Sequence, residues 1–195
     1  MSIKSTFHIF ISAIGYLAMF LLGATSGIIH PACYAYIGAI MPLFFACVYL
    51  YVAANLRCFG TATILNGFLF VVGLLTGEAD ATFIVGIILL TAFAEIIRFL
   101  YSYDTLKGVR WSFVPFAFSF FAYTAHWWTD TEGSLAAAVE EMPAGYDELM
   151  KSVIDNIPVL IVVLILTIPV AILGMRIAEK LLKKQTAKFK KKKCN

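Results

Sequence analysis

Hydrophobic residues in this chain gather into long stretches that short polar segments separate. The stretches that are nearly free of charged residues are 7–29, 36–54, 61–76, 82–101, 109–128 and 157–181. A helix needs about 20 apolar residues to cross a hydrocarbon core about 30 Å thick, and most of these stretches have about that length. The pattern predicts an all-α integral membrane protein, a single domain over residues 1–195 with six transmembrane helices in one bundle.

Composition supports the same class. Hydrophobic residues make up 61% of the chain and the mean hydropathy is +0.87, which is far above the range of water-soluble domains of this length. The stretch 61–76 is the shortest of the six and contains Asn66, Gly67 and Gly73. The sequence leaves two interpretations of this stretch: a span that is broken, or a span that is tilted.

Charge is divided between the two sides of the predicted membrane. If the six stretches cross in turn, all of the 15 Lys and Arg residues except Lys151 fall on one side. Short cytoplasmic connections retain positive charge, so this side is predicted to be the cytoplasm, with both termini in it and the protein in the cell membrane. Nine of the 12 acidic residues fall outside: Glu78, Asp80, Asp130, Glu132, Glu140, Glu141, Asp147, Glu148 and Asp155.

The tail 182–195 is rich in lysine, but no aromatic-interleaved RNA- or DNA-binding module precedes it. We therefore expect it to serve as a topology signal and to contact anionic lipid in the bilayer, and we expect no nucleic-acid partner. Among the cysteines, Cys33 is predicted outside while Cys58 and Cys194 are predicted inside, so no outer disulfide is expected.

The one long connection, 129–156, lies on the predicted outer side. Residues 135–142 favour a helix with Ser134 as a possible N-cap, 143–145 should break it, and 146–154 has an amphipathic pattern. Leu149, Val153 and Ile154 are expected on one face. Such a segment lies either on the membrane surface or on the bundle as a lid.

No catalytic constellation is present in the sequence. It has no HExxH, no Walker A sequence and no GxSxG, so peptidase, ATPase and hydrolase chemistry is not expected. A haem-binding cytochrome would need paired histidines at matching depth, and only His30 and His126 share a side, which leaves electron transfer as a minor alternative. We expect no enzyme activity, no cofactor and no metal site.

Glu95 is the acidic residue most relevant to ion-gradient coupling, because it lies inside a predicted span. It is about one and a half turns from the inner end of the stretch 82–101, and Arg98 follows at i+3. A helix-end ion pair between these two side chains is the favoured interpretation.

Small residues line one side of the first stretch: Ser12, Gly15 and Ala18, followed by Gly23 and Gly27 in a GxxxG arrangement. Small side chains let helices approach closely in lipid. For Gly15 and Ala18, contact with a partner subunit and packing inside the bundle are both open.

Aromatic, histidine and acidic residues converge at the outer ends of several stretches. This rim is the predicted small-molecule pocket, although aromatic belts also occur at ordinary membrane interfaces. Trp128 is about 100° around the helix from its neighbour Trp127 and is expected to face lipid. The predicted ligand-contacting residues are His30, Tyr34, Tyr36, Glu78, Tyr123, His126, Trp127 and Asp130.

Several short motifs resemble one family of transport proteins. They are Arg57–Gly60, Leu75–Gly77, Ala94–Ile96, Gly174–Arg176 and Leu181–Lys184, and the similarity runs from about Ile14 to Lys184. With the six stretches, they look like the substrate-binding S component of an energy-coupling factor (ECF) transporter of the MptD/Trep-Strep type. The first stretch departs from the AxxxA signature of many S components, because it has Gly15 and Ala18.

The resemblance implies a function. Such S components bind a micronutrient in an outward-facing pocket and associate through their first helix with a transmembrane T subunit that carries two cytosolic ATPase subunits. The implied ligand is a vitamin, a cofactor precursor or a flat porphyrin-like molecule. A non-transport membrane sensor or scaffold, and a stand-alone small transporter, remain the alternatives.

Overall fold

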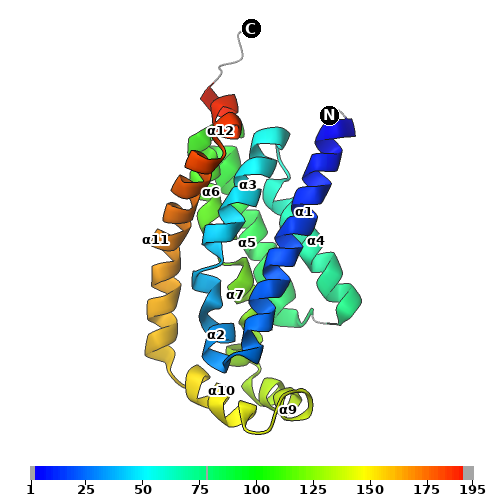
Figure 1. Cartoon of the computed structure of the whole chain (residues 1–195), viewed down its shortest axis with the longest axis vertical. Helices are drawn as coiled ribbons and strands as arrows, with labels where there is room; N and C mark the ends of the chain where they lie inside the picture. Colours follow the sequence, from blue (N-terminus) through cyan, green and yellow to red (C-terminus); the bar gives the residue numbers. More distant parts are fainter. Residues whose placement is uncertain (1–2, 78, 191–195) are drawn as a thin grey trace.

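The structure is a computed structural model that describes residues 3–77 and 79–190, and every regular element in this part of the chain is a helix. The long helices run side by side (Figure 1). The first residues of α1 and the helix α12 lie at one end, here called the tail end, and α9 and α10 lie across the other, here called the cover end. The elements are α1 (Ile3–Ala24), η1 (Thr25–Ile28), α2 (Pro31–Tyr36), η2 (Ile37–Ala39), α3 (Pro42–Leu56), α4 (Thr61–Thr76), α5 (Ala81–Leu100), α6 (Leu106–Phe116), α7 (Ser119–Thr124), α8 (His126–Thr129), α9 (Thr131–Glu141), α10 (Tyr146–Ile154), α11 (Ile157–Leu181) and α12 (Lys183–Lys190).

Three of the described helical segments are long and apolar enough to cross a membrane: Thr6–Ile28, Ala81–Leu100 and Ile157–Leu181. A fourth is the pair formed by Pro31–Ala39 and Pro42–Leu56, which is bent by 42°. Pro31 and Pro42 each occupy the first turn of a helix, where proline is tolerated because its missing N–H needs no partner. The apolar helix Thr61–Thr76 has only 16 residues.

The stretch 109–128 differs from the continuous helix that its hydropathy predicts. It is divided among α6, α7 and α8, with breaks at Ala117–Phe118 and at Ala125. Pro115 lies one residue before the end of α6, and a proline inside a helix removes one backbone hydrogen bond and crowds the preceding turn. The chain tightens there, since the N–H of Phe118 donates to the carbonyl of Pro115 at 3.1 Å.

Aromatic side chains fill the middle of the bundle. The ring of Tyr16 on α1 lies 4.8 Å from that of Phe45 on α3 and 5.4 Å from that of Phe116 on α6, measured between centroids. Such edge and tilted contacts add to the burial of large side chains. A second, separate apolar cluster lies at the cover end: Ala35, Trp127, Ala138, Tyr146, Met150, Val153 and Ile154.

The predicted outer connection forms α9 and α10, which together are called the cover. The break at 143–145 and the amphipathic helix 146–154 are confirmed. The expected N-cap is wrong, because α9 begins earlier, at Thr131, with Asp130 as its cap. Leu149 is exposed while Val153 and Ile154 are buried. The prediction that these three residues share one face is therefore wrong. The cover packs on α2 and α8, as a lid on the bundle would.

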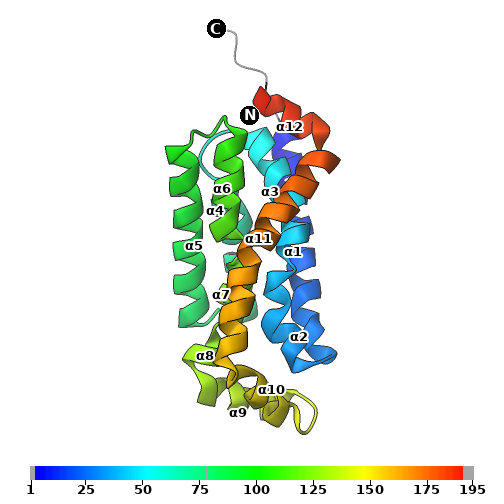
Figure 2. The same cartoon turned by 90° about the vertical axis from the view of Figure 1, so that its left-hand side faces the viewer.

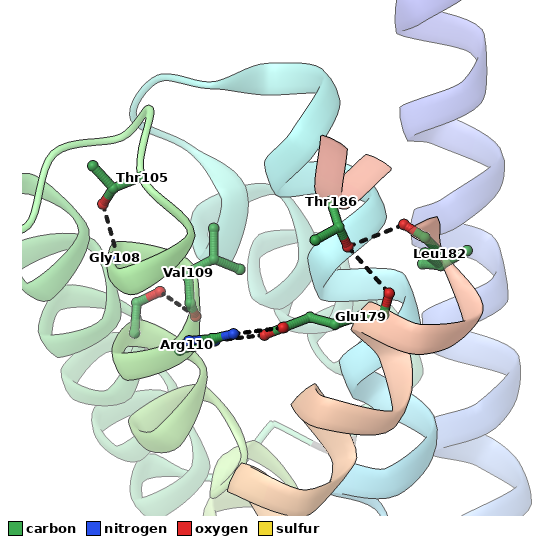
Figure 3. A network of polar contacts seen from close by, with 8 residues as sticks. Thr105, Gly108, Val109, Arg110, Glu179, Leu182 and Thr186 are labelled. Carbon is green, nitrogen blue, oxygen red and sulfur yellow. Dashed lines mark hydrogen bonds and ion pairs between the residues drawn. The ribbon is translucent and has the colours of Figure 1, made fainter. Parts of the chain in front are cut away.

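The tail end is held by polar contacts between helices (Figure 3). Arg110 on α6 pairs with Glu179 on α11 through two hydrogen bonds of 2.6 Å, and Thr186 on α12 donates toward the carbonyl oxygens of Glu179 and Leu182. Part of the basic tail is therefore an ordered helix docked on the bundle.

α12 also contacts the end of α3. The guanidinium of Arg57 donates to the carbonyl of Lys188 and lies 5.6 Å from the ring of Phe189, and the ammonium of Lys188 donates to Asn55 at 2.6 Å. Arg57 has a left-handed backbone, φ 47°, and begins the turn that Gly60, φ 118°, ends. The turn from α3 into α4 depends on that glycine, because L side chains rarely adopt such a backbone.

Candidate functional site

A cavity of about 460 Å³ lies under the cover, at the cover end of the bundle. Binding sites for small molecules usually measure about 300–1,000 Å³, so the space suits a ligand of modest size. It is bounded by the ends of η1, α2 and α5 and by α7 to α10. The side chains and glycines of the wall include Gly27, Tyr34, Asp80, Tyr123, His126, Trp127, Asp130, Ser134, Glu141, Met142 and Tyr146.

One wall of the cavity is aromatic. The ring of Trp127 stands edge-on to that of Tyr34, with centroids 6.3 Å apart and planes at 89°, and Tyr34 has a similar contact with Tyr123 at 6.3 Å. Trp127 is only 5% exposed. These rings hold one another in fixed orientations and offer an apolar surface on which a flat ligand can lie.

His126 connects this wall to the cover. Its Nδ1 lies 2.8 Å from the hydroxyl of Ser134 on α9, and the same hydroxyl donates toward the carbonyl of His126 at 3.3 Å. His126 also lies against Trp127, with ring centroids 5.0 Å apart. These contacts therefore join α8, which carries part of the aromatic wall, to α9 of the cover.

Two hydrogen-bond donors of the cavity wall have no protein partner among the described residues. They are the indole Nε1 of Trp127 and the hydroxyl of Tyr146, and both atoms are buried. Burial raises the pKa of the Tyr146 phenol, so the hydroxyl keeps its proton at neutral pH and can donate. Because a buried donor without a partner costs free energy, these groups favour a ligand or water that carries acceptors.

The acidic residues of the wall have structural roles as well. Asp80 accepts a hydrogen bond from the N–H of Phe83 at 2.6 Å and begins α5, and Asp130 accepts one from the N–H of Gly133 at 3.3 Å and begins α9. Carboxylates are stabilised at helix N-termini. With the exposed Glu141, they give the mouth of the cavity a negative charge.

Five of the predicted ligand-contacting residues meet in this cavity: Tyr34, Tyr123, His126, Trp127 and Asp130. His30 and Tyr36 do not line it. His30 is exposed and its Nδ1 accepts from the N–H of Ala32 at 3.1 Å, which caps α2, and the hydroxyl of Tyr36 donates to the carbonyl of Val153 at 2.9 Å, which holds the cover. Glu78 lies outside the described residues.

Trp128 corrects another expectation. Instead of facing lipid, it packs half-buried against the second cluster, and its indole donates to the carbonyl of Ile154 at 3.2 Å. The expectation assumed one straight helix, but α8 is a short turn at the foot of the cover. Trp128 therefore fixes α10, whereas Trp127 lines the cavity.

The wall residues that sequence reasoning missed include Tyr146, Gly27 and Ser134. Tyr146 is the first residue of α10. The amphipathic pattern after Gly145 predicts this helix, but it does not show which surface of the protein the helix packs against. Gly27 leaves room for Tyr146, since a Cβ there would lie 3.2 Å from its hydroxyl. Ser134 was read as a cap, although its real contact is His126.

The small residues of α1 fall into two groups. A Cβ on Gly23 would lie 2.7 Å from the ring of Phe120, so Gly23 and the buried Gly27 serve packing inside the protein. A Cβ on Gly15 would meet nothing within 4 Å, and Ala18 is exposed. Ser12 is half-buried and donates to the carbonyl of His8 at 2.8 Å. The surface of Gly15 and Ala18 is thus uncovered by this chain.

The long apolar helices and a match to a family model together define an integral membrane protein. The chain belongs to the family described as "Hypothetical bacterial integral membrane protein (Trep_Strep)", whose model matches residues 6–188. Comparison with curated proteins and with solved structures gives no match. Among the described residues, no group of three His, Cys, Asp or Glu side chains is placed to hold a metal ion.

Proposed function

We propose that this protein is the substrate-binding S component of an ECF-type importer, which captures a micronutrient in the cavity under the cover and releases it into the cell. The observation that carries the proposal is the cavity itself: it combines a fixed aromatic wall with two buried donors that lack a protein partner. A site of this composition recognises a flat molecule through its faces and orients it through its acceptors.

The proposed topology has six spans with both termini in the cytoplasm, so that the cover end faces outward. The spans are α1 with η1, the bent pair α2 and α3, α4, α5, the interrupted helices α6 to α8, and α11. Supporting this, the exposed acids of the cover, such as Glu132, Glu140 and Glu148, lie at one end, and the lysines of α12 lie at the other.

The ligand class follows from the wall. Trp127, Tyr34 and Tyr123 favour a planar or hydrophobic body, and the donors of Trp127 and Tyr146 favour acceptor groups on it. A vitamin, a cofactor precursor or a porphyrin-like molecule has this chemistry. The volume of about 460 Å³ favours the smaller members of that range.

The proposed partners are a transmembrane T subunit and two ATPase subunits, which supply the energy. α1 lies at the edge of the bundle (Figure 1), and the open surface at Gly15 and Ala18 is the proposed contact. Close approach of another helix requires small residues at the contact. Ser12 lies at the edge of the same surface.

The experiment is a pull-down of the tagged full chain from its native membrane, with protein and small-molecule mass spectrometry of the eluate. A T subunit, ATPase subunits and one stoichiometric small molecule are the expected companions. Gly15→Leu should remove the protein partners while the small molecule stays bound, because a Cβ at this position would meet nothing within 4 Å in this chain.

The matched variant is Gly67→Leu, which also adds a side chain where a Cβ meets nothing within 4 Å, but on α4. It should retain the T subunit. Loss of the small molecule in Gly15→Leu with the partners retained would mean that the Gly15 surface serves the bundle, and elution of the wild-type chain alone would favour a sensor or scaffold.

A further inference from the structure

A second hollow lies on the side of the bundle, between α4 and α5, towards the tail end. It measures about 590 Å³ and is separate from the cavity under the cover. α5 forms one edge of the bundle (Figure 2), and the exposed Ile88, Ile96 and Phe99 border the hollow. The hollow is therefore a lateral groove that opens off the apolar surface of the protein, where lipid surrounds it.

Glu95 lies in the wall of this groove and is only 4% exposed. Its Oε1 accepts hydrogen bonds from the backbone N–H of Ala62 at 2.8 Å and of Thr63 at 3.3 Å, at the start of α4. The partial positive charge of a helix N-terminus stabilises a carboxylate there. One of the two oxygens of Glu95 thus caps the start of α4.

The predicted ion pair between Glu95 and Arg98 is wrong within the described residues. Arg98 is fully buried and donates instead to the hydroxyl of Thr61 at 2.7 Å and to the carbonyl of Tyr103 at 2.9 Å. Both side chains reach the first turn of α4, where Glu95 accepts from backbone N–H groups and Arg98 donates to a side-chain hydroxyl. Arg98 therefore gives Glu95 no hydrogen bond.

The second oxygen of Glu95, Oε2, is buried and has no donor in the described protein. Neighbouring polar groups of the groove do not supply one: the amide of Asn66 donates to the hydroxyl of Thr91 at 3.0 Å, and that hydroxyl donates to the carbonyl of Ile87 at 2.6 Å. A buried carboxylate oxygen without a donor is costly. Glu95, which carries this oxygen, is one of the residues that line the groove.

The rest of the groove favours a cation with an apolar body. Four of its lining residues are aromatic, and a cation is attracted to the face of an aromatic ring. None of its described lining residues is Lys or Arg. The ring of Tyr103 already has the guanidinium of Arg98 5.5 Å from its centroid, which leaves the three phenylalanine rings for a ligand. The aromatic residues are Phe59, Phe70, Phe99 and Tyr103.

We propose that the groove between α4 and α5 is a binding site for a membrane-soluble primary amine, whose ammonium N–H donates to Glu95 Oε2 while its apolar body lies along α4 and α5. A charge-assisted hydrogen bond in a site of low dielectric is stronger than one between neutral groups. The site is independent of the cavity under the cover and of the transport function proposed for it.

The experiment uses the purified full chain in a neutral detergent with three probes of equal chain length: octylamine, octyltrimethylammonium and octanoate. Native mass spectrometry counts bound probe, and the thermal midpoint reports binding, since a ligand of the folded state raises it. Octylamine should bind one to one and at least about tenfold more tightly than octyltrimethylammonium, which has the charge but no N–H, and octanoate should not bind.

Three variants test the assignment. Glu95→Gln can still accept from α4 but presents an amide N–H₂ in place of the free oxygen, so it should lose the preference for octylamine. Gly67→Leu should remove binding of both cations with the fold retained, because Gly67 lines the groove and a Cβ there meets nothing within 4 Å. Glu140→Gln removes an exposed acid of the cover and should change nothing.

Equal binding of all three probes to the wild-type chain would overturn the proposal, since it would mean detergent-like association. An unchanged preference in Glu95→Gln would overturn it as well. If Glu95→Gln fails to fold, retention of octylamine by Gly67→Leu is the result that contradicts the proposed site.

Discussion

The two ends of the bundle are closed by different kinds of interaction. At the tail end, charged side chains bind across elements: Arg110 pairs with Glu179, and Arg57 binds the backbone of α12. At the cover end, the acids cap helices, and the cover is held by apolar packing together with hydrogen bonds such as those from Tyr36 and Trp128. The cover end is thus closed mainly by apolar packing, and the tail end by contacts of charged side chains.

The test with the largest expected effect asks which end of the bundle faces outward. Cys33 on α2 and Cys58 in the turn after α3 are both exposed, and they lie towards opposite ends of the bundle. An impermeant maleimide on intact cells should label Cys33 and leave Cys58 and Cys194 unlabelled, an all-or-none difference. Permeabilised cells provide the control, because Cys58 should then react. Labelling of Cys58 on intact cells would reverse the orientation and place the cavity inside.

The next test separates packing from partner surface on α1. Gly23→Leu should destabilise the protein by about 1–3 kcal/mol, since even a Cβ would lie 2.7 Å from Phe120 and 2.9 Å from Met41. Gly15→Leu is the matched substitution on the open surface and should leave the thermal midpoint in detergent nearly unchanged. Equal destabilisation by both would show that Gly15 is also packed inside the protein.

The third test concerns the aromatic wall. Trp127→Ala should weaken binding of the small molecule captured in the pull-down by roughly 1–3 kcal/mol, the free energy of burying one large side chain. Trp127→Phe keeps a ring but removes the unpaired N–H, so its loss should be smaller. Trp111 is exposed on α6, and Trp111→Ala is the control. An equal loss in Trp111→Ala would mean that the effect is global.

The smallest expected effect concerns the attachment of the cover. Tyr36→Phe removes one hydrogen bond to Val153 and should lower the free energy of local opening of α10 by about 1 kcal/mol. Hydrogen exchange of the α10 amides measures this opening. Glu179→Gln weakens the tail-end ion pair and should leave exchange in α10 unchanged. A faster exchange in α10 caused by Glu179→Gln would show that the two ends are coupled.

Much of the architecture follows from hydropathy, and the exceptions have local causes. Apolar runs predict the helices at α1, α5 and α11, and the sequence Pro143 to Gly145 predicts the break in the cover. Hydropathy does not show where a run is interrupted, so the division near Pro115 was missed. A proline in an apolar run is compatible with either a kink or a break, and tertiary packing decides.

The residues of the cavity could likewise be predicted only in part. Residues with one strong chemical role, such as Trp127 and Tyr123, were assigned to the rim and line the cavity. His30 has several possible roles, and a local backbone N–H satisfies it instead. Tyr146 could not be assigned, because its place in the wall depends on how α10 folds back over η1, a contact far apart in sequence.

The docking of α12 has a consequence for the order in which the protein is made. The backbone oxygen that binds Arg57 belongs to Lys188, which is 131 residues further along the chain. At ribosomal rates of about 5–20 residues per second, roughly ten seconds pass between the synthesis of the two partners. The contact between the turn after α3 and the tail can therefore form only late in synthesis, after the rest of the bundle has been made.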